Sequence, residues 1–217
     1  MADIIALYGG SFNPSTITHH RIAVTVRDAL RPQSVWYMVS AQNILKPDEG
    51  MLPFADRVAI AQLNVAGEQG VEVTAIEEDI AAAVHSTATA DILRELRNRM
   101  PGQRFVFVMG SDNFATLHLW RDYDYILSTM PIIVVPRLGS LQEARTAPAA
   151  LRARQLTDIN QVRTEEGWFW LDCPADDVNA TQIREALQQG TTPSALKPAI
   201  LAYIKEHKLF KRKSDGL

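Results

Sequence analysis

The chain has 217 residues and a formal net charge of −3 at pH 7, with 47% hydrophobic and 22% charged residues. This composition excludes a disordered chain and supplies enough apolar residues for a substantial core. The negative charge leaves no overall basic field for gripping a nucleic-acid backbone, and no apolar run approaches the roughly 20 residues that cross a bilayer. We therefore expect neither nucleic acid nor a membrane as a partner.

The N-terminus and the cysteine content predict a cytoplasmic protein. The first ten residues lack a basic start and a small-residue cleavage site, so we expect a first strand there instead of a secretory signal. Cys173 is the only cysteine, which excludes an internal disulfide and a thiolate-clustered zinc site. Taken alone, Cys173 is better interpreted as a small buried hydrophobe than as a nucleophile. The sequence leaves the oligomeric state open, a homo-oligomer included.

Strand-length and helix-length patterns alternate along the chain. Apolar runs bounded by glycine, proline or polar residues predict strands at residues 4–8, 35–39, 71–75, 105–109 and 132–135. Helical spacing predicts helices at residues 18–30, 54–66, 89–100 and 114–127. The alternation predicts an α/β fold with a doubly wound parallel sheet, in which ligands bind beyond the carboxyl ends of the strands.

The last third of the chain is less regular. Residues 139–163 predict a helix plus connector, and residues 169–171 an added edge strand. A capped helix is expected from residue 179, and a final amphipathic helix over residues 194–207. We predict one domain over residues 1–217, with an α/β core at 1–178 and a small C-terminal helical portion at 179–210. The basic residues 211–213 are interpreted as a solvated end.

The loop after the first strand is the most informative stretch. Gly9 and Gly10 let the backbone turn sharply and approach a ligand, while free N–H groups and a helix N-terminus attract phosphate oxygens. The loop lacks both the dinucleotide-binding G-x-G-x-x-G pattern and the P-loop pattern, which disfavours hydride transfer and ordinary ATPase chemistry. The loop therefore suits a nucleotide of another reaction class.

Thr16 and His19 are spaced to share one face of a first helical turn, so both could donate to one phosphate. The alternative is that Thr16 or Thr18 caps the helix and the histidines are surface residues. A metal site formed by His19 and His20 is disfavoured because adjacent helical residues point in different directions. With the preceding glycines, we favour His19 as a phosphate-binding group.

Two separated segments resemble the nucleotidylyltransferase superfamily. Residues 10–19 resemble its G-x-F-x-P-x-[HT]-x-x-H signature, and residues 179–184 its I-S-S-T-x-I-R element, with Asn179 and Ala180 where two serines are usual. Thr181 at a helix start and Arg184 one turn later would offer a hydroxyl and a guanidinium to one polyphosphate. The superfamily's Rossmann-like fold agrees with the predicted sheet.

Three intermediate segments narrow the resemblance to the nicotinate or nicotinamide mononucleotide adenylyltransferases. Residues 43–57 are similar to that family's N-P-x-K and F-x-x-R region, with Ile44 replacing a proline. Residues 85–93 resemble its S-Y-T-x-D-T-L segment, with Ala88 where a tyrosine is common. Residues 107–121 resemble its M-G-x-D-N-L and W-R elements closely. The resemblance thus covers nearly the whole chain.

This resemblance implies that ATP and a pyridine mononucleotide are the substrates, in NAD biosynthesis. A 5′-phosphate oxygen would attack the α-phosphorus of ATP and expel pyrophosphate, with Mg²⁺ bound to the ATP phosphates and no metal ligand in the protein. The implied catalytic residues are His19, Arg184 and Thr16. The implied ATP-binding residues are Gly9, Gly10, Ser11, Phe12, Gly110, Asp112, Thr181 and Ile183, and the implied acceptor-binding residues are Lys46, Thr89, Trp120, Arg121 and Arg137.

Several of these residues have plain structural alternatives. Asp112 could cap a helix beginning at Asn113, and Trp120 in isolation would be a core residue. Lys46 and Arg57 could be solvated surface charges. Their positions within the matching segments favour the functional interpretation of Asp112 and Trp120, while the role of Arg57 stays open.

The acceptor is the least determined part of the predicted reaction. Similarity around Lys46 and Trp120–Arg121 favours nicotinate mononucleotide over nicotinamide mononucleotide, giving deamido-NAD as the product. A transferase acting on phosphopantetheine or a cytidylyl acceptor would share the first loop but lack the elements at residues 107–121. A non-catalytic ATP-sensing module is disfavoured because Thr16, His19, Thr181 and Arg184 are all present.

Overall fold

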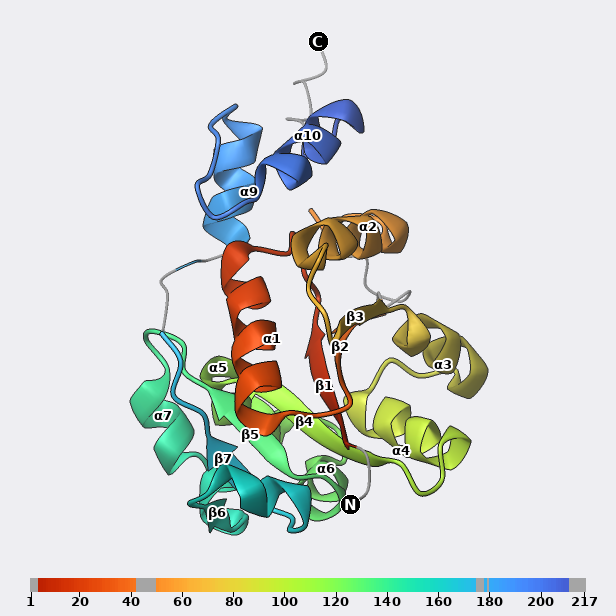
Figure 1. Ribbon diagram of the computed structural model, residues 1–217, viewed down its shortest axis with the longest axis vertical. Coiled ribbons are helices and arrows are strands. Elements are labelled where there is room, and N and C mark those ends of the chain that lie inside the picture. The colour runs from red at the N-terminus through yellow and green to blue at the C-terminus, as the bar shows by residue number, and fades with distance from the viewer. Residues whose placement is uncertain (1–3, 42–49, 175–177, 179, 211–217) are drawn as a thin grey trace.

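The computed structural model describes residues 4–41, 50–174, 178 and 180–210. Within them, seven parallel strands form one sheet in the order β3-β2-β1-β4-β5-β7-β6 (Figure 1). The strands are β1 (Ile4–Gly10), β2 (Ser34–Val39), β3 (Val71–Thr74), β4 (Arg104–Gly110), β5 (Ile132–Val135), β6 (Gln155–Leu156) and β7 (Trp168–Trp170). The predicted doubly wound parallel sheet is confirmed.

Helices separate the strands and cover both faces of the sheet. The α-helices are α1 (Ile17–Leu30), α2 (Phe54–Val65), α3 (Ile76–Val84), α4 (Thr89–Arg99), α5 (Ser111–Thr116), α6 (Tyr123–Thr129), α7 (Leu141–Thr146), α8 (Pro148–Arg152), α9 (Ala180–Gln188) and α10 (Pro198–Glu206). Two 3₁₀ helices, η1 (Leu117–Leu119) and η2 (Ile159–Arg163), complete the described elements. None of the described helices combines the length and the apolar character needed to span a bilayer.

The central strand shows why the sheet strands appear as continuous apolar runs. Ile4, Ala6 and Tyr8 of β1 pack in one core with α1 and α2. Ile5 and Leu7 point to the opposite face and pack in a second core with α3 to α8. Because successive strand side chains alternate between two covered faces, both sets must be apolar.

A third apolar cluster joins the C-terminal helices to α2. Figure 1 shows α9 and α10 together beyond the N-terminal end of α1. The backbone N–H of Ile17 donates to the carbonyl of Ala195, 2.9 Å away, so α1 begins against the segment that precedes α10. The buried members of this cluster are Leu52, Ile60, Ile183, Leu196, Ile200, Ile204 and Phe210.

The predicted continuous helix over residues 114–127 is wrong. The chain forms α5 and η1, then becomes extended at Trp120 (ψ 144°) and left-handed at Asp122 (φ 54°) before α6 begins. Phe114 and Ile126 are both fully buried, so two short helices satisfy the apolar spacing that one long helix would have satisfied. The helix also starts at Ser111, earlier than predicted.

The C-terminal strand prediction also needs correction. The strand at Trp168–Trp170 is not at the edge, because it pairs with β5 on one side and with β6 on the other. The edge is β6, whose two residues are too few to show a period. Helix α3 was not predicted, and the last helix begins at Pro198, later than expected, with proline at its first turn.

Candidate active site

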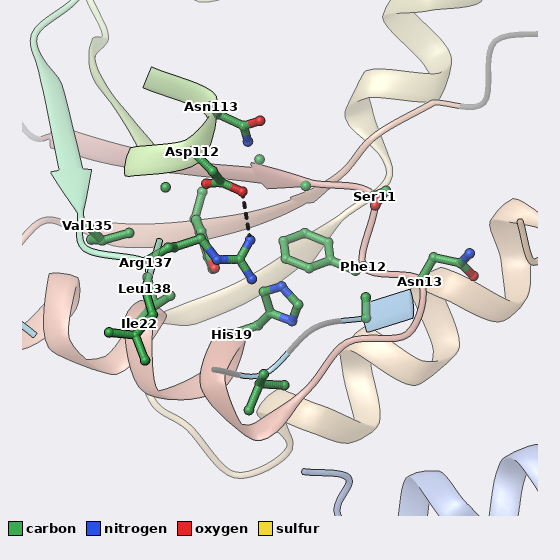
Figure 2. Close-up of a pocket in the computed structure, with 16 residues that line it drawn as sticks. Ser11, Phe12, Asn13, His19, Ile22, Asp112, Asn113, Val135, Arg137 and Leu138 are labelled. Carbon is green, nitrogen blue, oxygen red and sulfur yellow. Dashed lines mark hydrogen bonds and ion pairs between the residues drawn. The ribbon is translucent and has the colours of Figure 1, made fainter. Parts of the chain in front are cut away.

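A cavity of about 350 Å³ opens at the carboxyl ends of β1, β4 and β5 (Figure 2). The strand order places β2 on one side of β1 and β4 on the other, so the chain reverses direction along the sheet here. Such a switch point is where open α/β sheets bind ligands. The lining residues are Tyr8, Gly9, Gly10, Ser11, Phe12, Asn13, His19, Ile22, Gly110, Asp112, Asn113, Val135, Arg137, Leu138, Val178 and Ala180.

The loop from β1 to α1 folds tightly around Phe12. The Phe12 side chain is buried with φ 46°, and its ring stacks on Tyr37 with the ring centroids 4.0 Å apart. A Cβ atom added at Gly10 would lie 3.0 Å from this ring. A larger residue at position 10 would press on the Phe12 ring, which in turn meets the His19 ring edge-on at 5.2 Å.

Side chains from distant elements hold the carbonyl groups of this loop. Each donates a hydrogen bond to one carbonyl oxygen of the loop, so the loop backbone is held at three positions. The pairs are Arg57 Nη1 to Ser11 O at 2.9 Å, Arg184 Nη1 to Asn13 O at 2.9 Å, and Asn64 Nδ2 to Thr16 O at 2.7 Å. The donors come from α2 and α9, so both helices hold the loop backbone in place.

Thr16 sets the orientation and the protonation of the His19 ring. The Thr16 backbone N–H donates to His19 Nδ1 at 3.1 Å, and Thr16 Oγ1 lies 2.9 Å from the same nitrogen. The His19 backbone N–H points back to Thr16 Oγ1, which makes Thr16 the N-cap of α1. Because Nδ1 accepts a backbone N–H, these partners assign the proton of the neutral ring to Nε2.

His19 is held in its neutral form. Burial, reinforced by the positive charge of Arg137, lowers the pKa of His19 from 6.5 to about 3. The ring therefore acts near pH 7 as a neutral N–H donor at the cavity wall. Sequence reasoning identified His19 but could not assign its charge, because the charge depends on burial and on a cation 118 positions away in the chain.

The adjacent histidine has a different environment. His20 Nε2 lies 2.9 Å from Glu68 Oε1, and His20 does not line the cavity. The two histidines thus make separate contacts. The described residues contain no group of three or more histidine, cysteine or acidic side chains placed to hold a metal ion.

The structure revises the predicted role of Thr16. Its side chain is only 1% exposed and does not line the cavity, so it is not placed beside His19 as a second phosphate donor. The residue caps α1 and orients His19, which combines the capping alternative with a contribution to the site. A spacing of three residues does bring the two side chains together, but they bond to each other.

Arg184 brings the two phosphate-type motifs into contact. Its guanidinium donates to Asn13 O at 2.9 Å and to Thr181 Oγ1 at 3.0 Å. Ala180, at the start of the same helix, lines the cavity. Ile183 instead points into the C-terminal core and is buried there, so its side chain does not face a ligand in the cavity. Asn179 lies outside the described residues.

The opposite wall of the cavity carries an ion pair. Arg137 Nη1 lies 3.2 Å from Asp112 Oδ2, and Figure 2 shows Arg137 between Asp112 on one side and the rings of Phe12 and His19 on the other. A Cβ at Gly110 would lie 2.3 Å from Asp112 Oδ1 and 2.9 Å from Arg137 Cδ, so glycine lets this pair keep its geometry. Asp112 is in the first turn of α5 and Gly110 is the N-cap, so the alternative of Asp112 as the N-cap is wrong.

Of the predicted acceptor-binding residues, Arg137 lines the cavity, whereas Thr89, Trp120 and Arg121 lie elsewhere. Arg121 Nη2 pairs with Asp91 Oδ2 at 3.2 Å, which joins the segment after η1 to the first turn of α4, where Thr89 stands. Trp120 is half-buried against the core on that face of the sheet. Thr89, Trp120 and Arg121 do not line the cavity, and Lys46 lies outside the described residues.

Two residues of α2 have roles that the sequence left open, for Arg57, or gave no sign of, for Asn64. Arg57 is only 1% exposed and donates to the Ser11 and Ser40 carbonyls, so it is a buried structural cation and the surface-charge alternative is wrong. Burial lowers the pKa of its guanidinium. Asn64 is fully buried, whereas an isolated asparagine in a helix is ordinarily exposed. The burial of both residues is explained by the loop that packs on α2, because its carbonyl groups accept their hydrogen bonds.

Cys173 agrees with its interpretation as a small apolar residue. It is half-buried against the core that contains α1 and α2, and burial raises the pKa of its thiol. A raised pKa disfavours the thiolate that nucleophilic chemistry requires.

Comparison with known proteins places this chain in a family. The cytidylyltransferase-like family model matches residues 7–186. A relative from Gluconobacter oxydans (strain 621H) is 35% identical over 190 residues, covering 85% of this chain and 95% of its own. One from Erythrobacter litoralis (strain HTCC2594) is 39% identical over 186 residues, covering 83% of each chain. Both bear the name "Probable nicotinate-nucleotide adenylyltransferase".

The chain belongs to the nicotinate-nucleotide adenylyltransferase family. Solved structures support the same fold for this adenylyltransferase. The Plasmodium falciparum nicotinic acid mononucleotide adenylyltransferase complexed with NaAD matches with a TM-score of 0.72 at 16% identity, covering 96% of this chain and 97% of that chain. The same enzyme complexed with APC matches with a TM-score of 0.71 at 15% identity. At such identities the likeness is one of fold.

Proposed function

We propose that this adenylyltransferase joins ATP and nicotinate mononucleotide to give deamido-NAD and pyrophosphate, a step of NAD biosynthesis. The observation that carries the proposal is the hydrogen bond from Arg184 to Asn13 O at 2.9 Å, between residues 171 positions apart. It joins the two motifs beside the cavity wall that holds His19, where Ala180 of the second motif also lies, while Thr181 and Arg184 are not among the lining residues. Two separate anion-binding segments at one cavity are what a triphosphate requires.

The reaction needs alignment more than it needs a base. A 5′-phosphate oxygen of the mononucleotide attacks the α-phosphorus of ATP, forming one P–O bond while the bond to the β-phosphate breaks and pyrophosphate leaves. The attacking phosphate is already largely ionised near neutral pH, since its second pKa is about 6. The protein must therefore hold two polyanions in line and stabilise the charge that develops between them.

We assign the charge stabilisation to a small set of donors. The Nε2–H of neutral His19 donates to the reacting α-phosphate, and the backbone N–H groups of the Gly9–Phe12 loop donate to oxygens beside it. A guanidinium has five N–H donors, so Arg184 can bind phosphate while it holds Asn13 and Thr181. Mg²⁺ enters with ATP as the MgATP substrate and neutralises part of the phosphate charge.

The opposite wall is assigned to the nucleoside. Asp112 is placed to accept hydroxyls of the adenosine ribose, and Gly110 keeps the space beside it open. In the free protein the Asp112 carboxylate pairs with Arg137, so ribose binding must share or replace that contact. The pyridine ring is assigned to Trp120, whose indole face suits a flat, electron-poor ring.

The deciding experiment measures pyrophosphate release with MgATP and each candidate acceptor. We expect kcat/KM for nicotinate mononucleotide to exceed that for nicotinamide mononucleotide by about tenfold or more. A site whose donors bind the nicotinate carboxylate would leave some of those donors unpaired when an amide takes its place. MgATP without an acceptor is the control and should release no pyrophosphate. Pyrophosphate release from MgATP with phosphopantetheine as the only active acceptor, or with no acceptor added, would contradict the proposal.

A further inference from the structure

Asn64 lies directly beneath the residue that orients His19. It stands in the last turn of α2, is fully buried, and donates through Nδ2 to Ser15 Oγ and to Thr16 O, each at 2.7 Å. A carbonyl oxygen can only accept, so the Thr16 contact fixes which end of the amide faces the loop. The other end, Asn64 Oδ1, is buried and has no hydrogen-bond partner among the described residues.

Stability alone does not account for an asparagine at this position. Thr16 O also accepts the backbone N–H of His20 at 3.1 Å, and Ser15 Oγ lies 2.5 Å from the Tyr37 hydroxyl. Both loop groups would keep a partner without Asn64, while the unpartnered Oδ1 is destabilising where it lies. A leucine has a similar size and shape and would leave no polar atom unpaired.

The two bonds from Asn64 restrain the loop on either side of the Thr16 Cα. One holds the side chain of the preceding residue, Ser15, and the other holds the Thr16 carbonyl, so together they limit the Thr16 backbone to its extended conformation (φ −122°, ψ 167°). In that conformation the Thr16 N–H and Oγ1 both meet His19 Nδ1. A small rotation at Thr16 would move both groups off the ring nitrogen.

Asn64 is itself held in place from the C-terminal side. The Lys197 Nζ, at the N-cap of α10, donates to the Asn64 backbone carbonyl. The Ala195 carbonyl accepts the backbone N–H of Ile17 at the start of α1. Hydrogen bonds therefore join the end of α2 and the start of α1 to the segment that precedes α10.

We propose that Asn64 is a positioning residue that keeps the proton of His19 on Nε2, facing the phosphate site, by fixing the conformation of Thr16. The inference rests on the proposed function and deepens it, because it names a residue that acts on the phosphate through another side chain. It predicts that the active form of the site depends on α2, which contributes no side chain to the cavity wall.

The test replaces Asn64 by leucine, which conserves volume and removes both donors. We expect kcat to fall about 10- to 100-fold. This is the range found in metal sites when the hydrogen-bond partner that orients a metal-binding side chain is removed. The KM values for MgATP and the mononucleotide should stay within about threefold, and Tm should be unchanged or higher. The ¹⁵N shifts of the His19 ring, recorded without substrate, should show that Nε2 no longer holds the proton alone.

Ile60→Ala is the matched control. Ile60 stands one turn earlier on α2, is equally buried, and packs in the C-terminal cluster. We expect this variant to lose thermal stability through the cavity it creates, while kcat and the His19 ring shifts stay those of the original chain. Loss of stability and loss of histidine positioning are thereby separated on one helix.

An Asn64→Leu protein with unchanged His19 ring shifts would overturn the inference, whether or not kcat falls, because any loss would then not act through the histidine. If Asn64→Leu does not fold, Asn64→Ala is measured in the same way and decides by the same criterion. The ring shifts are read on the free protein. Absence of adenylyl transfer to any pyridine mononucleotide would therefore overturn the proposed function and leave this measurement valid.

Discussion

The phosphate side of the molecule, residues 9–19 with α9, differs sharply from the acceptor side, Thr89 with Trp120 and Arg121. On the phosphate side, loop carbonyls are held by buried or half-buried side chains from α2 and α9, and His19 is fixed in one neutral form. On the acceptor side, Arg121 has a side chain that is 69% exposed and is held by one ion pair with Asp91. Exposed ion pairs contribute little net free energy, whereas a buried network fixes geometry before the ligand arrives.

This difference shows where each half of the reaction is prepared. A preorganised donor set lowers the barrier of the chemical step, while a loosely held surface segment can contribute to binding only after it has been ordered. Substitutions on the phosphate side should therefore act mainly on kcat, and substitutions on the acceptor side mainly on the KM of the mononucleotide.

The largest effect is expected for His19→Ala. Loss of the only ring donor assigned to the reacting phosphate should lower kcat by about two to four powers of ten, with a much smaller change in the KM of MgATP. Steady-state pyrophosphate release measures both. His20→Ala is the control, because His20 pairs with Glu68 away from the cavity and should retain kcat. Near-normal turnover of the His19 variant would show that the phosphate side does not act on the chemical step through His19.

Gly110→Ala should have the next largest effect. The added Cβ would lie 2.9 Å from Arg137 Cδ and would also collide with the Asp112 carboxylate, so the ion pair must shift. We expect kcat/KM for MgATP to fall about 10- to 100-fold because the ribose partner is displaced by part of an ångström or more. Gly102→Ala provides the control, since nothing lies within 4 Å of a Cβ there, although its φ of 87° carries some strain. An unchanged kcat/KM in the Gly110 variant would remove Asp112 from the nucleotide site.

Trp120→Ala tests the acceptor side directly. We expect the KM of the mononucleotide to rise about tenfold while the KM of MgATP changes little, because only the pyridine ring loses its stacking partner. Trp170→Ala is matched to it, since Trp170 is also half-buried against the same core but carries Arg145 over its ring. Equal increases in both KM values for the Trp120 variant would make Trp120 a core residue only.

The smallest effect concerns the pH dependence of stability near the phosphate side. Burial raises the pKa of Glu77 to about 7, and its Oε1 accepts the Ala41 backbone N–H at 3.0 Å. The ordinary value of 4.5 describes the unfolded chain, so between pH 4.5 and 7 the folded state keeps a proton that the unfolded state has lost. Native stability must then fall as pH rises through this window.

Glu77→Gln should remove that pH dependence. The variant should be more stable than the original chain at pH 8, by on the order of 2 kcal/mol or a few degrees in Tm, and the difference should shrink at pH 5. Thermal unfolding at both pH values measures it. The same difference at pH 5 and at pH 8 would mean that Glu77 does not titrate in this window.

Much of the fold was predictable because its signals are local. Residues 132–135 are apolar at every position, and the structure buries all of them in β5. The break at Trp120–Asp122 was missed because two short helices and one long helix have the same apolar spacing. The edge strand β6 was missed because a two-residue strand is defined by its partner, β7, and by no periodicity of its own.

The candidate site divides in the same way. Gly10, His19 and Arg184 stand in short strings whose backbone and donor chemistry can be inferred from the residues alone. The role of Arg57 stayed open and Asn64 could not be recognised, because a buried polar residue is identified by the acceptors it meets, and those acceptors belong to a loop about 40 to 50 positions away. Thr16 was assigned to the phosphate because spacing predicts proximity without saying which group bonds to which.

By itself the amino-acid sequence determined the alternating α/β plan, the phosphate-type loop and the family resemblance, because apolar period, glycine content and short motifs act over a few neighbouring residues. Only the tertiary structure decided the neutral state of His19, the hydrogen bonds from α2 and α9 that hold the loop, and the absence of Trp120 from the lining of the described cavity. Charge state and hydrogen-bond partners depend on burial and on groups from remote segments, which come together only when the chain has folded.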